Sequence, residues 1–220
     1  MAKIIAFGDT HGDNLFFYTK IPYGDILICT GDFSGYGTAI DVSVFNEDIK
    51  RLKSKIGFKH VIIVPGNHDC FMEQAYNVSE EMLEDVICLF DKEIVIDGIK
   101  FWGTPWTLEF NNWSFMGTEK DLEYYFRYIP SDTDVIISHG PPYGILDQVK
   151  GGPHLGSIAL RDRILQVKPK LVLFGHVHDA YGMLEKDAII YANVSLLNER
   201  YALVNLPQIF NIKGEKHDKR

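Results

Sequence analysis

The chain has 220 residues, of which 46% are hydrophobic and 24% charged, a composition typical of globular proteins and unlike that of disordered or fibrous chains. Its 22 basic and 30 acidic residues give a net charge of −8, which argues against a broad basic face that grips nucleic acid through its phosphates. Asp9, His11 and Asp13 interrupt the short apolar run at the start, so we expect neither a secretory signal nor a membrane span.

Five apolar runs of strand length recur along the chain, and most of them stop at a glycine or a polar cluster. Uninterrupted apolar runs of this length are typical of strands that are buried on both faces of a sheet. The expected strands are residues 3–7, 25–30, 60–65, 134–139 and 170–174.

Segments with helical periodicity lie between these strands. In the first of them an apolar stripe that includes Val44 and Ile49 ends just before Gly57, a typical C-terminal stop. Ser79, Thr118 and Ser157 are the expected N-caps of the other three. The expected helices are residues 40–56, 79–89, 118–129 and 157–167.

The pattern changes in the segment EIVIDGIKFWGTPW, residues 93–106, where Asp97-Gly98 between apolar arms predicts a hairpin. Further strands are expected within residues 188–197 and 201–212, and residues 212–220 are expected to form a frayed tail. No linker or repeat divides the chain, so we expect a single domain over residues 1–220. Alternating strands and helices followed by a strand-rich end predict an α/β fold with at least one mixed sheet covered by helices.

Five loops that follow apolar runs contain residue types that bind metals, each beside a glycine. In open α/β sheets such sites form at the carboxyl ends of strands, so five distant loops can meet at one rim. The loops read FGDTHGD (7–13), TGDFSGYG (30–37), PGNHDC (65–70), SHGPP (138–142) and FGHVHD (174–179).

These loops contain five of the eight histidines of the chain, beside carboxylates and an amide. Such donors suit divalent metals of intermediate hardness, and they are too many for one ion, which favours two metals that share a bridging carboxylate. The alternate spacing of His176 and His178 places both side chains on one side of an extended segment, although two unrelated loop histidines would read the same way. The candidates are Asp9, His11, Asp32, Asn67, His68, His139, His176 and His178.

In this order the five blocks resemble those of the calcineurin-like metallophosphoesterase superfamily. The longer segments GTPW (103–106), FNNWSF (110–115), SHGPPYGILD (138–147) and YANVS (191–195) resemble a subgroup, the metallophosphoesterase-domain-containing cyclic-nucleotide phosphodiesterases. The resemblance implies two mixed β-sheets packed as a sandwich and flanked by helices. It also implies two divalent metal ions, with Mn²⁺ favoured and Fe²⁺, Zn²⁺ or Mg²⁺ as alternatives.

Roles for the candidate residues also follow from the resemblance. Asp9, His11 and His178 resemble ligands of one metal, and Asn67, His139 and His176 resemble ligands of the other, with Asp32 bridging them. His68 resembles the general acid that protonates the leaving oxygen, with Asp69 orienting its ring. A metal-bridging hydroxide would attack the phosphorus.

A small phosphodiester is the expected substrate. Related protein phosphatases carry arginines in the second and third blocks that clamp a phosphate dianion, and GDFSGYG and VPGNHD have none, which favours a singly charged diester such as a cyclic nucleotide. The alternatives are a phosphomonoesterase, a nuclease or a non-catalytic protein-binding scaffold on the same fold. A nuclease would need a basic groove, and a scaffold would have lost metal ligands.

Three further residues are candidates for substrate contact. Trp106 and Trp113 can stack a nucleobase, although tryptophans beside a hairpin are more often packing residues. His154, in the glycine-rich KGGPHLGS loop, is either a substrate contact or a solvent-exposed loop histidine.

Three widely spaced cysteines form no C-x-x-C pair, which favours a reducing cytoplasm as the location of the protein. The expected partner is a small-molecule phosphate ester, with no extended nucleic-acid binding and no membrane. The sequence leaves the oligomeric state open.

Overall fold

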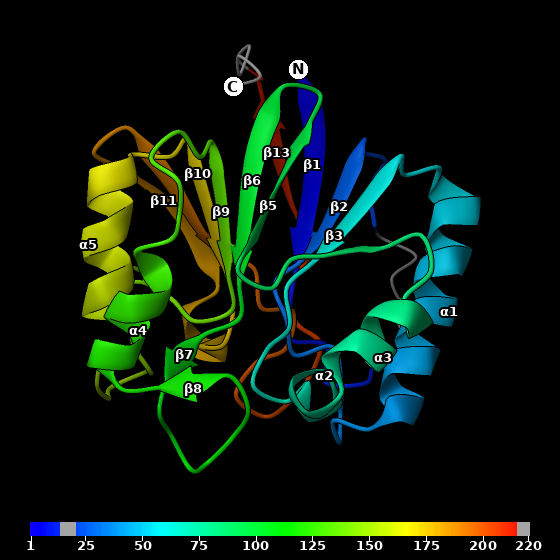
Figure 1. The fold of residues 1–220 in the computed structure, drawn as a ribbon, viewed down its shortest axis with the longest axis horizontal. Helices are drawn as coiled ribbons and strands as arrows, with labels where there is room; N and C mark the ends of the chain where they lie inside the picture. Colours follow the sequence, from blue (N-terminus) through cyan, green and yellow to red (C-terminus); the bar gives the residue numbers. More distant parts are fainter. Residues whose placement is uncertain (14–20, 215–220) are drawn as a thin grey trace.

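The computed structural model describes residues 1–13 and 21–214, which form two large β-sheets with helices on their outer faces (Figure 1). In chain order the elements are β1 (Ala2–Phe7), β2 (Ile26–Cys29), α1 (Ala39–Ile56), β3 (His60–Ile63), α2 (Cys70–Gln74), α3 (Tyr76–Met82), β4 (Ile87–Cys88), β5 (Lys92–Ile96), β6 (Ile99–Thr104), β7 (Thr107–Leu108), β8 (Met116–Gly117), α4 (Glu119–Phe126), β9 (Val135–Ser138), α5 (Ile158–Val167), β10 (Leu171–Phe174), the 3-10 helix η2 (His178–Ala180), β11 (Gly182–Lys186), β12 (Ile189–Asn193) and β13 (Gln208–Ile212).

Both large sheets are mixed. The first has the strand order β13-β1-β2-β3-β4, in which β13 is antiparallel to β1 and the other strands are parallel. The second has the order β11-β12-β10-β9-β6-β5, in which the two edge strands β11 and β5 are antiparallel to their neighbours. The α/β fold with two mixed sheets flanked by helices is therefore confirmed.

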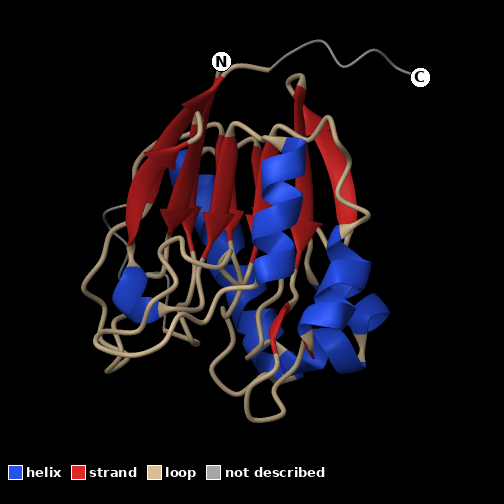
Figure 2. Ribbon diagram, turned by 90° about the vertical axis from the view of Figure 1, so that its left-hand side faces the viewer, coloured by secondary structure: helices blue, strands red, loops and turns tan. Residues whose placement is uncertain are grey.

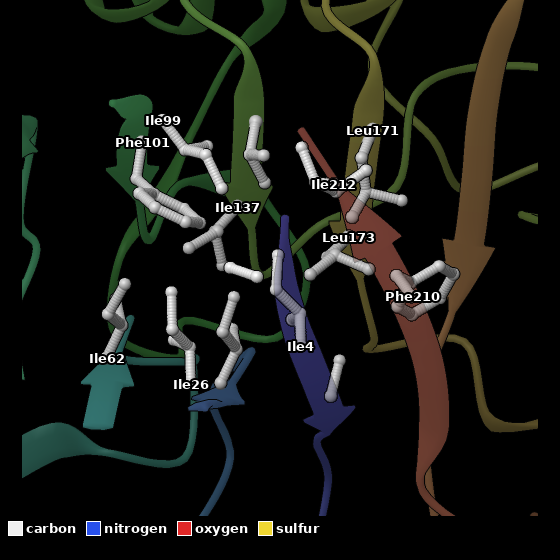
Figure 3. Close-up of a cluster of buried hydrophobic side chains, with 14 of the residues drawn as sticks. Ile4, Ile26, Ile62, Ile99, Phe101, Ile137, Leu171, Leu173, Phe210 and Ile212 are labelled. Carbon is white, nitrogen blue, oxygen red and sulfur yellow. The ribbon is translucent and has the colours of Figure 1, made fainter. Parts of the chain in front are cut away.

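An apolar core joins the two sheets face to face (Figure 3). Side chains alternate along β1, so that Ile4 packs between the sheets while Ile5 and Phe7 pack toward α1 on the outer face. Burial on both faces is the reason why residues 3–7 read as an unbroken apolar run. The labelled side chains of this core are Ile4, Ile26, Ile62, Ile99, Phe101, Ile137, Leu171, Leu173, Phe210 and Ile212.

Helices cover the outer faces, with α1 and α3 on the first sheet and α4 and α5 on the second (Figure 1). The parallel strands end at the edge opposite the chain termini, and the loops that follow them gather there (Figure 2). The candidate site residues of the sequence are on these loops, so the topology brings them to one end of the sandwich. No helix within residues 1–13 and 21–214 is long and apolar enough to cross a bilayer.

Several local expectations are confirmed. Asp97 (φ 51°) and Gly98 (φ 74°) connect β5 and β6 as a tight hairpin with Ile96 opposite Ile99. Thr118 and Ser157 cap α4 and α5, because each hydroxyl accepts a hydrogen bond from the backbone N–H three residues ahead.

The helix expected over residues 79–89 is wrong. Two short helices, α2 and α3, begin earlier, and Ser79 lies inside α3, where its buried hydroxyl donates to the carbonyl of Ala75 at 3.0 Å and does not cap a helix. Asp85, with φ 58°, then turns the chain into β4. Residues 87–88 thereby extend the first sheet by pairing with β3. This pairing joins segments that are distant in the sequence, so helical periodicity does not reveal it.

Other expectations need smaller corrections. Val44 is 48% exposed, and the buried face of α1 instead includes Val42 and Phe45. The strand β11 had no predicted counterpart, because Asp187 and Ala188 both turn with positive φ without a glycine. Only 208–212 of the expected strand 201–212 forms a strand. Ile212, expected to begin the frayed tail, pairs with Ala2, and residues 215–220 of that tail lie outside the described residues.

Candidate metal centre

Three of the predicted ligands form the first donor group at the loop end of the sandwich. The Nε2 atoms of His11 and His178 lie 3.2 Å apart, and His178 Nε2 lies 3.5 Å from Asp9 Oδ1. All three donor atoms lie within 4.8 Å of one another. Nitrogen and oxygen donors that converge at this spacing can surround one cation.

The second group contains the other three predicted ligands. Asn67 Oδ1 lies 2.9 Å from both His139 Nε2 and His176 Nδ1. Two imidazoles and an amide oxygen thus face the same point.

Asp32 lies between the two groups. Its Oδ2 atom is 3.7 Å from His11 Nε2 and 3.4 Å from His139 Nε2, while its Oδ1 atom accepts the backbone N–H of His68 at 2.7 Å. One carboxylate oxygen therefore faces both donor groups, which is the geometry that a bridging ligand requires.

The loops reach this arrangement through unusual backbone conformations. Asp9, His11, Asp32 and His176 all have positive φ, between 46° and 69°, a region that non-glycine residues adopt at some cost and that clusters at functional sites. Glycine provides room for them, since a Cβ on Gly175 would lie 2.1 Å from Asp9 Oδ2. The fold thus accepts local strain to converge these side chains.

Hydrogen bonds from the loops orient two of the imidazoles. The Nδ1 atoms of His139 and His178 lie 3.0 Å and 3.1 Å from the carbonyl oxygens of Thr30 and Asn198, and since a carbonyl only accepts, each Nδ1 carries the hydrogen. In the neutral ring Nε2 is then left with its lone pair, directed into the site. Such outer partners are what hold a metal-binding histidine in the correct tautomer.

The protonation states also suit cation binding. Burial lowers the pKa of His11 and of His176 to about 4, so both rings are neutral at pH 7. Burial acts to lower the pKa of His139 as well, but the charge of Asp32 outweighs it and raises that pKa to about 9. Burial opposes ionisation of Asp32, yet His139 lowers its pKa. In the metal-free protein the positive charge beside Asp32 is therefore the proton on His139, and a cation would replace it. The neutral imidazoles, the amide oxygen and the carboxylates together fit a pair of divalent cations.

His68 lies at the site as expected, whereas Asp69 makes contacts other than the expected one with the His68 ring. The His68 ring lies beside the donor groups, and its centroid is 4.5 Å from that of His11. The fully buried Asp69 instead accepts the backbone N–H groups of Asp32, Ser34 and Gly66 at 2.7–2.9 Å. Asp69 therefore ties the second and third loops together, which corrects its expected contact with the His68 ring.

A cleft of about 690 Å³ opens over the donor groups. His154 reaches its wall, and a 2.7 Å hydrogen bond joins its Nδ1 atom to the buried Asp147 carboxylate. Trp113 also lines the cleft. Lysine and arginine are absent from the lining within the part of the chain that the structure describes.

Trp106 does not line this cleft. Its indole stacks on Tyr125 at a centroid distance of 4.0 Å, and its N–H donates to Asp91 at 2.7 Å. The structure therefore does not bring Trp106 to the cleft; its half-buried side chain packs against two core clusters instead.

Two site residues were absent from the sequence candidates. Ser195 Oγ donates to Asp9 Oδ2 at 2.7 Å, and Tyr201 lines the cleft with its ring centroid 4.8 Å from that of His11. Residues 194–196 run beside Gly8 as an isolated bridge between the sheets, which is how Ser195 reaches Asp9. For Ser195 the only sequence indication was its place in the segment YANVS, and Tyr201 had none.

Comparison with known proteins places this site in a family context. A family model described as calcineurin-like phosphoesterase matches residues 2–180. The UPF0046 protein T07D4.2 of Caenorhabditis elegans is 28% identical over 249 residues, covering 99% of this chain and 62% of that protein. The human metallophosphoesterase domain-containing protein 1 is 29% identical over 238 residues, covering 96% of this chain and 71% of that protein.

One solved structure shares the fold of this chain. A solved crystal structure superposes with a TM-score of 0.66 at 17% identity, covering 88% of this chain and 90% of the other. The match of the family model to most of the chain, together with the donor groups that its motifs build, supports a metal-dependent phosphoesterase. This chain belongs to the calcineurin-like phosphoesterase family.

Proposed function

We propose that this protein is a phosphodiesterase that hydrolyses a small phosphodiester such as a cyclic nucleotide. The observation that carries the proposal is the position of Asp32 Oδ2 between two donor groups at the floor of a cleft. A pair of divalent cations, with Mn²⁺ favoured, would bind the phosphoryl oxygens and lower the pKa of a water nucleophile.

The residues of the chain would divide this work. Asp9, His11 and His178 would hold one cation, Asn67, His139 and His176 the other, and Asp32 both. Ser195 would keep Asp9 in place through its 2.7 Å hydrogen bond.

His68 would act on the leaving group. When the bond between phosphorus and the leaving oxygen breaks, that oxygen gains an electron pair and needs a proton. A protonated His68 ring beside the donor groups would supply it and would later recover a proton from solvent. The oxygen of the attacking water would form the new bond to phosphorus, and the products are a phosphomonoester and an alcohol, which are parts of one molecule when the diester is cyclic.

The cleft lining favours a diester over a monoester. A monoester is a dianion at neutral pH, and proteins often bind it through the paired N–H groups of arginine. The described lining offers neither arginine nor lysine, and it contains the additional carboxylates Glu109, Asp179 and Glu199. A singly charged diester fits such a surface better than a dianion does.

The proposal is tested with purified protein and Mn²⁺. We expect hydrolysis of bis-p-nitrophenyl phosphate, and we expect His68→Ala to reduce turnover by about 10²–10⁴-fold while retaining metal. Parallel assays with 2′,3′-cyclic nucleotides, 3′,5′-cyclic nucleotides and p-nitrophenyl phosphate rank the ester classes. If the metal-loaded protein hydrolyses none of these esters, the assignment as an enzyme is refuted. If it prefers the monoester, the assignment as a phosphodiesterase is refuted.

We also infer a reducing location such as the cytoplasm. The three cysteines are free, and Cys29 and Cys88 are buried in the core. Localisation of the tagged full-length protein in its own cells tests this inference.

A further inference from the structure

The ring of His68 is held by aromatic neighbours. The indole of Trp113 stacks on it with a centroid distance of 4.2 Å and an interplanar angle of 24°. The ring of His11 meets it edge-on, at 4.5 Å and 89°. The sequence led us to expect the Asp69 carboxylate as the group that orients the His68 ring. The oxygens of Asp69 instead accept hydrogen bonds from backbone N–H groups, and the two aromatic rings contact His68.

The loop that carries Trp113 is tied directly to the segment that carries His68. The backbone N–H of Ser114, the next residue after Trp113, donates to the carbonyl of Asn67, the residue before His68, at 3.3 Å. The N–H of Phe115 donates to the Glu73 carboxylate on α2 at 2.9 Å. Two consecutive tethers thus set Trp113 beside His68.

Core packing and backbone turns reinforce this placement. Phe115 is fully buried and packs against Phe90, so the end of the loop is anchored in the core. Asn111 and Asn112 both have positive φ, 52° and 57°, which reverses the chain just before Trp113. The indole itself is 41% exposed and lines the cleft. A large apolar side chain is therefore kept at the mouth of the site by structure that the core enforces.

We propose that Trp113 is the positioning residue of His68: its indole plane fixes the imidazole plane so that the ring points at the leaving oxygen of the substrate. This inference deepens the proposed function and rests on it for its kinetic part. Proton transfer requires a heavy-atom separation of about 2.6–3.2 Å, so an imidazole free to rotate would lose much of its rate advantage. Stacking on an indole restricts rotation without adding a carboxylate to a cleft that must admit an anion.

The kinetic test varies the leaving group. Methyl p-nitrophenyl phosphate has a leaving group that departs readily without a proton, whereas methyl phenyl phosphate needs the acid more. We expect Trp113→Ala to lower kcat about 10-fold or more for the phenyl ester and about 2-fold or less for the p-nitrophenyl ester. Trp113→Phe keeps a flat ring and should stay within about 3-fold of wild type on both.

An equal loss on both esters would overturn the inference, because it would indicate damage to the site as a whole. A rise in KM on both esters with kcat unchanged would also overturn it and would make Trp113 a substrate contact instead. The same leaving-group pattern in His68→Ala, at larger amplitude, is the internal standard.

A second measurement does not depend on turnover. In the Zn²⁺-loaded protein, stacking on Trp113 should shift the ring-proton resonances of His68 upfield, and Trp113→Ala should move them back by several tenths of a ppm. Phe110→Ala, which removes a ring from the same loop, is the matched control and should leave them in place. Unmoved His68 resonances in Trp113→Ala would refute the contact even in an active enzyme, whereas the expected shift in an inactive one would refute only the proposed function.

Discussion

His11 Nε2 and His178 Nε2 lie 3.2 Å apart although 167 residues separate them in the chain. Since the Nδ1 of His178 carries its hydrogen toward the carbonyl of Asn198, the Nε2 lone pair of His178 faces His11. That lone pair can accept the Nε2–H of His11, or both rings can direct their Nε2 lone pairs at one cation. Asp9 Oδ1 lies 3.5 Å from His178 Nε2 as a third donor at the same point, and this convergence favours a metal site.

Metal removal should therefore destabilise the protein. At a free-ion concentration of 100 times Kd, each bound ion stabilises the folded state by about 2.7 kcal/mol, so two ions correspond to a Tm change of about 10–20 °C for a chain of this size. We expect chelation with EDTA to lower Tm by this amount and elemental analysis to find about two ions per chain. His178→Ala should retain about one ion, whereas His60→Ala, at the start of β3 and outside the site, should retain both. An unchanged ion count in His178→Ala would contradict this assignment.

Ser195→Ala should weaken metal binding without unfolding the protein. The hydroxyl donates to the buried Asp9 carboxylate at 2.7 Å, and loss of an outer partner of this kind typically costs about 10–100-fold in metal affinity. Competition with a chromophoric chelator measures the change. Ser79→Ala is the matched control, because it removes a buried hydroxyl that bonds to the Ala75 carbonyl within α3. Equal metal affinities of the two variants would contradict the role of Ser195 in supporting Asp9.

Asp69→Asn should destabilise the fold strongly. The carboxylate accepts three backbone N–H groups, and an amide would direct its own NH₂ group at one or more of them. Burial and the neighbouring Asp32 carboxylate raise the pKa of Asp69 to about 7, so urea unfolding is best measured at pH 8, where the carboxylate is ionised. We expect a loss of about 2–4 kcal/mol. Asp187→Asn, at an exposed turn, should cost little, and a similarly small cost for Asp69→Asn would be evidence against its loop-anchoring role.

Metal uptake should release a proton. The pKa of His139 is about 9 in the metal-free protein, so its ring is protonated at pH 7 and must become neutral to bind a cation. Burial opposes protonation of His178, but its contact with Asp9 raises the pKa of that ring as well. Apparent affinity should therefore rise with pH up to about 9 and then level off, and at least one proton should leave near pH 7. Calorimetry in two buffers of different ionisation enthalpy counts the protons released. A heat of binding that is the same in both buffers would show that no proton leaves.

The sequence alone identified the metal ligands as candidates, because the residue types that bind metals must follow buried strands, and both features are local. Apolar runs, turn residues and caps in the same way predicted most strands, the Asp97-Gly98 hairpin and the starts of α4 and α5. These features depend on residues within a few positions of one another, so periodicity and propensity can reveal them.

The tertiary structure alone decided which side chains support the ligands. Ser195 reaches Asp9 across the two sheets, Trp113 reaches His68 through tethers to Asn67 and α2, and Asp69 binds loops in place of the imidazole expected from its position in the motif. Each contact joins segments that lie far apart in the chain or turns a side chain in a direction that the motif does not specify. Packing and loop closure determine such contacts, and a local sequence pattern predicts neither of them.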